Sequence, residues 1–135
     1  MVCIYCGNET SVINSRKQKR RNSVWRRRVC NECNATVTSI ESIDLENALV
    51  VTSQKRHKPF SRDKLFISIY ESCKHRSDAQ TSATALTDTI ITLLYPLIKN
   101  ASVTRSNIIE TTTKVLQRYD QPAAVYYKSF HPISK

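Results

Sequence analysis

The sequence predicts an α+β protein with two parts: an N-terminal four-cysteine zinc-ribbon β-hairpin, followed by a mainly α-helical domain with a small β-hairpin. Two observations support this fold class. Two Cys-x-x-Cys pairs lie within the first 33 residues, and apolar residues recur at helical spacing through most of the chain after residue 60. We place the domain boundary after residue 46, so that the expected domains are residues 1–46 and 47–135.

The two cysteine pairs are predicted to bind one structural Zn²⁺ ion. A two-residue gap lets one tight turn supply two corners of a tetrahedron, and four thiolates leave no open position for water. Two disulfides in a secreted domain are the alternative. No secretory leader is recognisable before the first pair, which favours metal. The predicted ligands are Cys3, Cys6, Cys30 and Cys33.

Each predicted zinc turn needs a residue that tolerates a left-handed backbone directly after its second cysteine. Gly7, the only glycine in the chain, and Asn34 occupy these two places. Between the turns, β-forming residues flank a polar segment, Lys17 to Ser23, which predicts a β-hairpin.

The predicted ribbon is strongly cationic. Residues 1–36 contain eight basic and two acidic side chains, a balance of +6, within a whole-chain net charge of +10. A zinc ion with four thiolates subtracts two charges, which leaves about +4 on the ribbon. This density predicts a phosphate-binding surface. A solvated surface that only keeps the ribbon soluble is the alternative.

The strands after the zinc site are expected in two places. Residues 36–43 are rich in β-branched side chains and are predicted to extend the ribbon with another strand, and residues 44–47 are predicted to form a polar connector. A second hairpin begins at residues 49–51, turns through the basic segment 53–58 and returns at Pro59 and Phe60.

Four helices are expected after this hairpin. Ser61 caps the first, on whose apolar face Cys73 is predicted to be a core residue and not a ligand. The second begins near Ser77 or Asp78, packs Leu93 or Leu94 and Leu97 inward, and bends or ends at Pro96. A polar loop at residues 100–104 precedes the third, and Asp120 and Pro122 start the last.

Several motifs together resemble one known family, the NrdR transcriptional repressors of ribonucleotide reductase genes, which join a zinc ribbon to an ATP-cone. The resemblance covers almost the whole chain. The matching segments are the four cysteines, Val12 to Arg16, Arg26 to Cys30, Thr38 to Glu41, Leu49 to Val51, Lys58 to Leu65 and Leu116 to Asp120.

The resemblance implies a ribbon that binds double-stranded DNA and a cone that takes ATP or dATP as effector and changes self-association, so a homo-oligomer is expected. The implied DNA contacts are Arg16, Arg26, Arg27 and Arg28. On a strand, Arg26 and Arg28 share one face, while Arg27 and Trp25 share the other. Trp25 stands where the family tends to have an arginine, and either packs on the ribbon or stacks on a base.

The sequence departs from the family mainly in the nucleotide module. The family's Lys-Arg-x-Gly turn is replaced by Thr52 to Lys55, and an aromatic residue and an arginine are missing from the segment 123–129. The remaining candidate nucleotide-binding residues are Lys55, Arg56 and Lys64.

The expected function is therefore a zinc-dependent, DNA-binding repressor without catalytic residues, in the cytoplasm and associated with the nucleoid. No apolar run is long enough to span a membrane. The scattered histidines form no catalytic constellation. The alternative function is a nucleotide-sensing or protein-interaction module whose basic ribbon is a docking surface.

Overall fold

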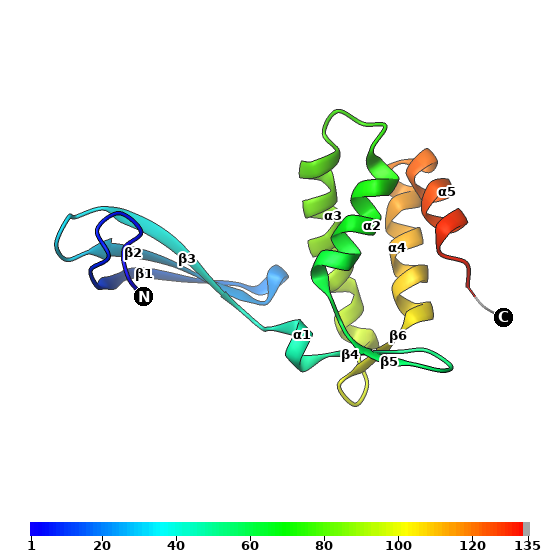
Figure 1. Cartoon of the computed structure of the whole chain (residues 1–135), viewed down its shortest axis with the longest axis horizontal. Helices are drawn as coiled ribbons and strands as arrows, with labels where there is room; N and C mark the ends of the chain where they lie inside the picture. The colour runs from blue at the N-terminus through cyan, green and yellow to red at the C-terminus, as the bar shows by residue number, and fades with distance from the viewer. Residues whose placement is uncertain (134–135) are drawn as a thin grey trace. The chain divides into compact units, whose positions relative to one another are not determined.

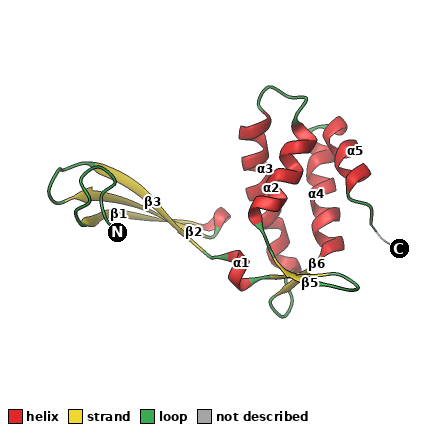
Figure 2. Cartoon of the chain, viewed as in Figure 1, coloured by secondary structure: helices red, strands yellow, loops and turns green. Residues whose placement is uncertain are grey.

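A computed structural model of the chain describes residues 1–133, and these residues form two compact units. The first unit is Met1–Ile43, and the second begins at Asp44. The first is built from strands and the second mostly from helices (Figure 2). The α+β fold class predicted from the sequence is confirmed.

The first unit is a three-stranded antiparallel sheet with the strand order β1-β2-β3. Its strands are β1 (Thr10–Gln18), β2 (Ser23–Cys30) and β3 (Thr36–Ser42). A 3-10 turn, η1 (Lys19–Arg21), joins the first two strands, and Asn22 closes it with a φ of 48°. The predicted hairpin and its third strand are therefore present, and the hairpin strands are longer than the apolar residues alone indicated.

A β-bulge at Ile13 determines which side chains share a face of this sheet. Val12 lies opposite Arg28, whereas Asn14 lies opposite Arg27, so that Ile13 has no partner of its own on β2. The extra residue places Asn14 and Arg16 on the face of Arg27.

The first unit has almost no apolar core of its own. Among its described residues the buried side chains are Cys3, Thr10, Ser23 and Cys30. A unit of this size without an apolar interior needs a cross-link or a metal to fold.

The second unit places a small sheet at one end of four helices (Figure 1). The sheet has the order β5-β4-β6, with β5 antiparallel and β6 parallel to β4. The elements are α1 (Leu45–Ala48), β4 (Val50–Thr52), β5 (His57–Pro59), α2 (Arg62–Cys73), α3 (Ala79–Leu94), η2 (Tyr95–Leu97), β6 (Ser102–Thr104), α4 (Arg105–Tyr119) and α5 (Gln121–Phe130).

Helix α2 packs on α3 and α5, and α4 packs on the same two helices. Their inner faces enclose one apolar core, with Ile69, Ile90 and Leu116 fully buried at its centre. Cys73 is also fully buried there, which confirms its prediction as a core residue. The predicted cap is confirmed as well, because the Ser61 hydroxyl accepts a hydrogen bond from the backbone N–H of Lys64.

Three sequence predictions for this unit were wrong. The polar connector contains helix α1, capped by Asp44, which accepts from the backbone N–H of Asn47. The loop at residues 100–104 contains strand β6, which pairs with β4. Leu97 was expected on the inner face of α3, but it lies in the η2 turn with 38% of its surface exposed. Of the two alternatives Leu93 and Leu94, Leu94 is the buried one.

Candidate metal centre and nucleic-acid interface

The two cysteine turns have matching backbone geometry. The backbone N–H of Gly7 donates to the carbonyl of Cys3 at 2.9 Å, and that of Asn34 donates to the carbonyl of Cys30 at 3.1 Å. Gly7 and Asn34 have φ values of 76° and 56°, so both adopt the left-handed conformation expected from the sequence. Each turn therefore presents its two thiols in the same way.

The four predicted ligands lie together. Their Sγ atoms are all within 4.8 Å of one another, with Cys3 and Cys33 3.7 Å apart and Cys6 and Cys30 3.4 Å apart. A disulfide would require about 2.05 Å. Tetrahedral coordination at a Zn–S distance of about 2.3 Å separates the sulfurs by about 3.8 Å. The spacing therefore fits one structural Zn²⁺ ion.

The four thiols influence each other's ionisation. The backbone N–H of Asn8 and the Cys30 thiol lower the pKa of Cys6 to about 6. At Cys33 the backbone N–H of Ala35 acts in the same direction, but the Cys30 thiol and desolvation raise the pKa to about 12 overall. Four thiols so close together cannot all ionise unless a cation compensates their charge, and Zn²⁺ supplies two positive charges.

Strand β2 distributes the predicted DNA-contact arginines over both faces of the sheet. Arg26 Nη2 lies 3.1 Å from Glu41 Oε2, and its Nη1 donates to Ser15 Oγ at 3.1 Å. Arg28 Nε donates to Ser39 Oγ at 3.0 Å. These two arginines join β2 to its neighbouring strands.

The opposite face carries the other two candidates. The Arg16 guanidinium lies 5.9 Å from the centre of the Trp25 ring, a cation–π contact between paired residues of β1 and β2. Arg27 is exposed two residues further along β2. Of the two alternatives for Trp25, packing on the ribbon is present, because the ring is half-buried.

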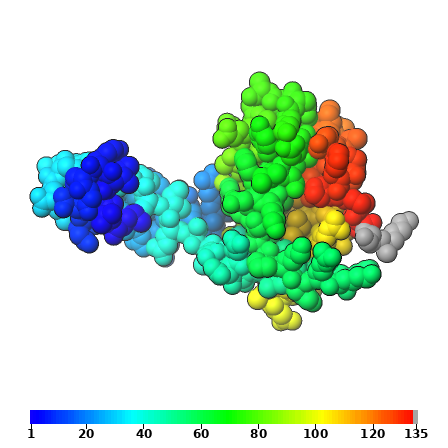
Figure 3. All heavy atoms as spheres, in the orientation of Figure 1, coloured from blue at the N-terminus to red at the C-terminus, as the bar shows by residue number. Residues whose placement is uncertain are grey.

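The candidate nucleotide residues gather at the sheet end of the second unit. Lys55 and Arg56, in the β4–β5 turn, line a cavity of about 800 Å³ with the first residues of α4. Lys64 lines a separate cavity of about 220 Å³ between α2, α4 and α5. The tip of the β4–β5 hairpin protrudes from the surface here, as does the turn at residues 99–102 (Figure 3).

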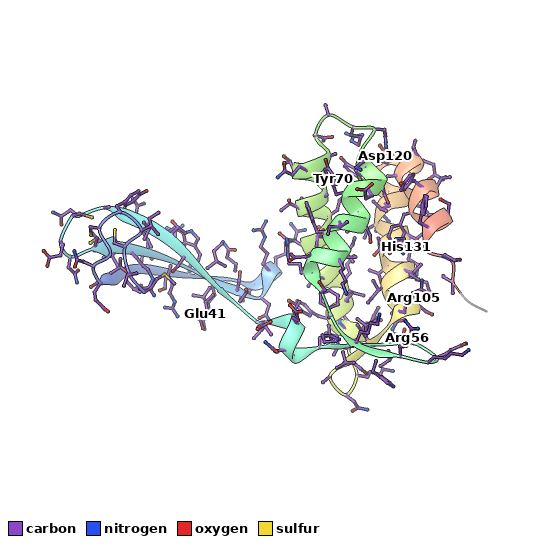
Figure 4. The ribbon with its side chains drawn as sticks, viewed as in Figure 1. Glu41, Arg56, Tyr70, Arg105, Asp120 and His131 are labelled. Carbon is purple, nitrogen blue, oxygen red and sulfur yellow. The ribbon has the colours of Figure 1, made fainter. Side chains whose placement is uncertain are left out.

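Three further residues line these cavities; Lys58 belongs to the basic segment 53–58 predicted from the sequence, whereas Arg105 and His131 were not singled out. Arg105 lines both of them and Lys58 does so too, while His131 lines the smaller one. Arg56, Arg105 and His131 are labelled along the same side of the unit in Figure 4. Desolvation lowers the pKa of His131, helped by the nearby Arg105, and so favours the neutral imidazole. Arg105 directly follows the cap of α4, a position that could have indicated an anion site.

Known proteins are similar to this chain in sequence. The family model described as the N-terminal domain of NrdR-like transcriptional repressors matches residues 1–41. The transcriptional repressor NrdR of Pelobacter propionicus is 31% identical over the whole chain and 93% of its own length. That of Phenylobacterium zucineum is 30% identical over 97% of this chain and 84% of its own.

The fold and the four-cysteine site, with these relatives, define a zinc-dependent transcriptional repressor. The chain belongs to the NrdR family, so the resemblance expected from the sequence is confirmed. No helix among the described residues has the length and apolar character needed to cross a membrane.

Proposed function

We propose that this repressor binds double-stranded DNA through its zinc ribbon and acts on ribonucleotide reductase genes, in the cytoplasm and on the nucleoid. The observation that supports DNA binding is the four-cysteine cluster at the base of a sheet that carries Arg16, Arg26, Arg27 and Arg28, of which Arg16 and Arg27 are exposed. Arginine forks bind phosphates and read guanine edges, and a structural zinc fixes the strands that carry them.

The experiment is a binding titration of the zinc-loaded chain with labelled duplexes at physiological salt. One duplex carries the promoter region of the host's ribonucleotide reductase genes, and the control has the same length and base composition in scrambled order. Tighter binding to the promoter supports the proposal. Equal affinity for the two duplexes contradicts only the assignment to ribonucleotide reductase genes. If neither duplex binds, the ribbon is instead a docking surface for another protein.

The cavities of the second unit support a second activity, the binding of ATP or dATP. The larger cavity brings Lys55, Arg56, Lys58 and Arg105 together beside the first turn of α4, where the helix dipole also attracts anions. This arrangement suits a polyphosphate. We further propose that nucleotide binding changes the assembly of the chain into homo-oligomers.

Calorimetric titration with ATP and dATP, paired with a mass measurement in solution, tests this activity. Arg56→Gln and Arg105→Gln should each weaken binding about tenfold. Lys99→Gln, which removes a charge outside the residues lining either cavity, should leave binding unchanged. Absence of heat with either nucleotide would contradict the nucleotide proposal and leave the DNA proposal intact.

A further inference from the structure

The two faces of the ribbon sheet carry the same net charge but differ in its arrangement. Lys17, Arg26 and Arg28 share one face with a carboxylate, whereas Arg16 and Arg27 are the only charged side chains in the paired rows of the other. On the face of Arg26 and Arg28, Glu41 adds a carboxylate, exposed over 69% of its side-chain surface and paired with Arg26. A phosphate approaching this face would meet that negative charge. The hydrogen bonds of Arg26 to Ser15 and of Arg28 to Ser39 would also compete with any phosphate contact.

The opposite face contains no acidic side chain in the paired rows of its three strands. Two rows cross its centre: Asn14, Arg27 and Thr38 form one, and Arg16, Trp25 and Ile40 form the other. The bulge at Ile13 brings Asn14 and Arg16 onto this face. Both charges on the face are therefore without a neighbouring carboxylate in the sheet.

Apolar surface lies between these charges. Ile40 is 60% exposed and lies opposite the half-buried Trp25 across the β2–β3 ladder. The Trp25 ring supports the Arg16 guanidinium at 5.9 Å, which restricts the arginine before any ligand arrives. A duplex offers a matching pattern, with phosphates for the arginines, and sugars and thymine methyl groups for the ring and the isoleucine.

We propose that the Arg16–Trp25–Arg27 face lies against duplex DNA, with Trp25 in direct contact, and that Arg26 and Arg28 mainly hold the strands together. This inference rests on the proposed DNA-binding function. It assigns the face of the sheet that meets the duplex and adds Trp25 as a contact residue. Charges on the far face lie behind a sheet and contribute less, because the Debye length at physiological salt is about 8 Å.

Trp25 is the only tryptophan in the chain, so tryptophan emission reports directly on contact between this ring and the duplex. Selective excitation of tryptophan during titration with duplex DNA should give a saturable change in emission as the ring leaves water. A parallel titration followed by label on the duplex measures affinity independently. Binding seen by the label, with tryptophan emission unchanged throughout, would overturn the contact. Absence of binding by both signals would instead contradict the DNA-binding function.

Charge-matched variants test the face. Arg16→Gln and Arg27→Gln should each weaken duplex binding tenfold or more, whereas Arg26→Gln, with the same loss of charge, should weaken it less than threefold. Trp25→Ala should weaken binding about tenfold, and Trp25→Phe less than threefold. Zinc content and circular dichroism identify any variant that fails to fold.

Glu41→Gln provides a test that does not depend on losing an arginine. It removes a carboxylate from the Arg26 face, so affinity should rise strongly if DNA lies there and change less than threefold if DNA lies on the Trp25 face. A rise of tenfold or more in Glu41→Gln, or equal losses in Arg26→Gln and Arg27→Gln, would overturn the assignment while leaving DNA binding itself established.

Discussion

Arg76 Nη1 lies 3.1 Å from Asp120 Oδ2, so that the loop after α2 is joined to the first turn of α5. The same carboxylate accepts from the backbone N–H of Ala123 at 3.0 Å, as the cap of α5, and both of its oxygens lie 3.1 Å from His75 Nε2. Figure 4 labels Asp120 at this end of the bundle. One side chain therefore caps a helix and links two segments far apart in the sequence.

We predict that this carboxylate makes the second unit sensitive to acid. The backbone N–H of Ala123, then His75 and Arg76, lower the pKa of Asp120 below its usual value. Its contribution is therefore present above the unfolded pKa of about 3.9 and is lost as the pH falls through the lower folded pKa. Asp120→Ala should lower the free energy of unfolding by about 1–2 kcal/mol at pH 7, from the lost cap alone.

Asp120→Asn separates the cap from the charge, because an amide oxygen still accepts from Ala123. Urea unfolding at neutral and acidic pH should show a smaller loss than for alanine and a flatter decline towards low pH. Glu110→Gln, at an exposed position of α4, is the control and should behave as wild type. If the Asp120→Asn variant were as acid-sensitive as wild type, this role of the carboxylate would be refuted.

The first zinc turn should tolerate asparagine better than alanine at Gly7. An added Cβ would meet no atom within 4 Å, so the only cost is the left-handed backbone. For Gly7→Ala this strain is about 1 kcal/mol, which lowers zinc affinity about fivefold. Gly7→Asn should cost less, because Asn34 already holds the equivalent place in the second turn with a φ of 56°.

Competition with a chromogenic chelator measures the two zinc affinities. Equal affinities for the alanine and asparagine variants would show that the backbone conformation at this position does not limit zinc binding.

The turn before β6 should be stabilised by glycine. Asn100 and Ala101 have φ values of 49° and 56°, and the backbone groups of Lys99 and Ser102 bond to each other across them. Such turns favour glycine, and alanine is strained there. Ala101→Gly should raise the free energy of unfolding by up to about 1 kcal/mol, measured by urea denaturation. A lower stability would indicate that the strain is absent in solution.

The fold was predictable where a side chain's chemistry acts locally. The cysteine spacing, Gly7, Asn34 and the Ser61 cap each correspond to a feature of the structure. Strand β6 was missed because it is three residues long and depends on pairing with β4, far away in the sequence. Helix α1 was missed because a single turn leaves no apolar periodicity.

The candidate sites were predictable as sets of residues but not as surfaces. Alternation along β2 correctly separated Arg26 and Arg28 from Arg27 and Trp25. The position of Arg16 could not be foreseen, because the bulge at Ile13 shifts all later residues of β1 by one place. Arg105 was missed for a similar reason, since its cavity forms only when β6 brings the start of α4 beside the β4–β5 turn.

Binding of duplex DNA should weaken steeply with salt. Each neutralised phosphate contributes about −0.9 to the slope of log affinity against log salt concentration. The two arginines of the proposed face therefore predict a slope of about −2 for each bound ribbon. Fluorescence anisotropy of a labelled duplex across a salt series measures it, and a slope near zero would exclude phosphate contacts as the source of affinity.

Zinc removal tests the central claim most directly, because the first unit has four buried residues while the second has its own apolar core. The purified, reduced chain should contain one zinc ion. A strong chelator should abolish duplex binding and amide hydrogen-exchange protection in residues 10–42, and leave α2 to α5 protected. A metal-free chain that keeps a protected ribbon and binds DNA as tightly as the zinc-loaded chain would contradict the account.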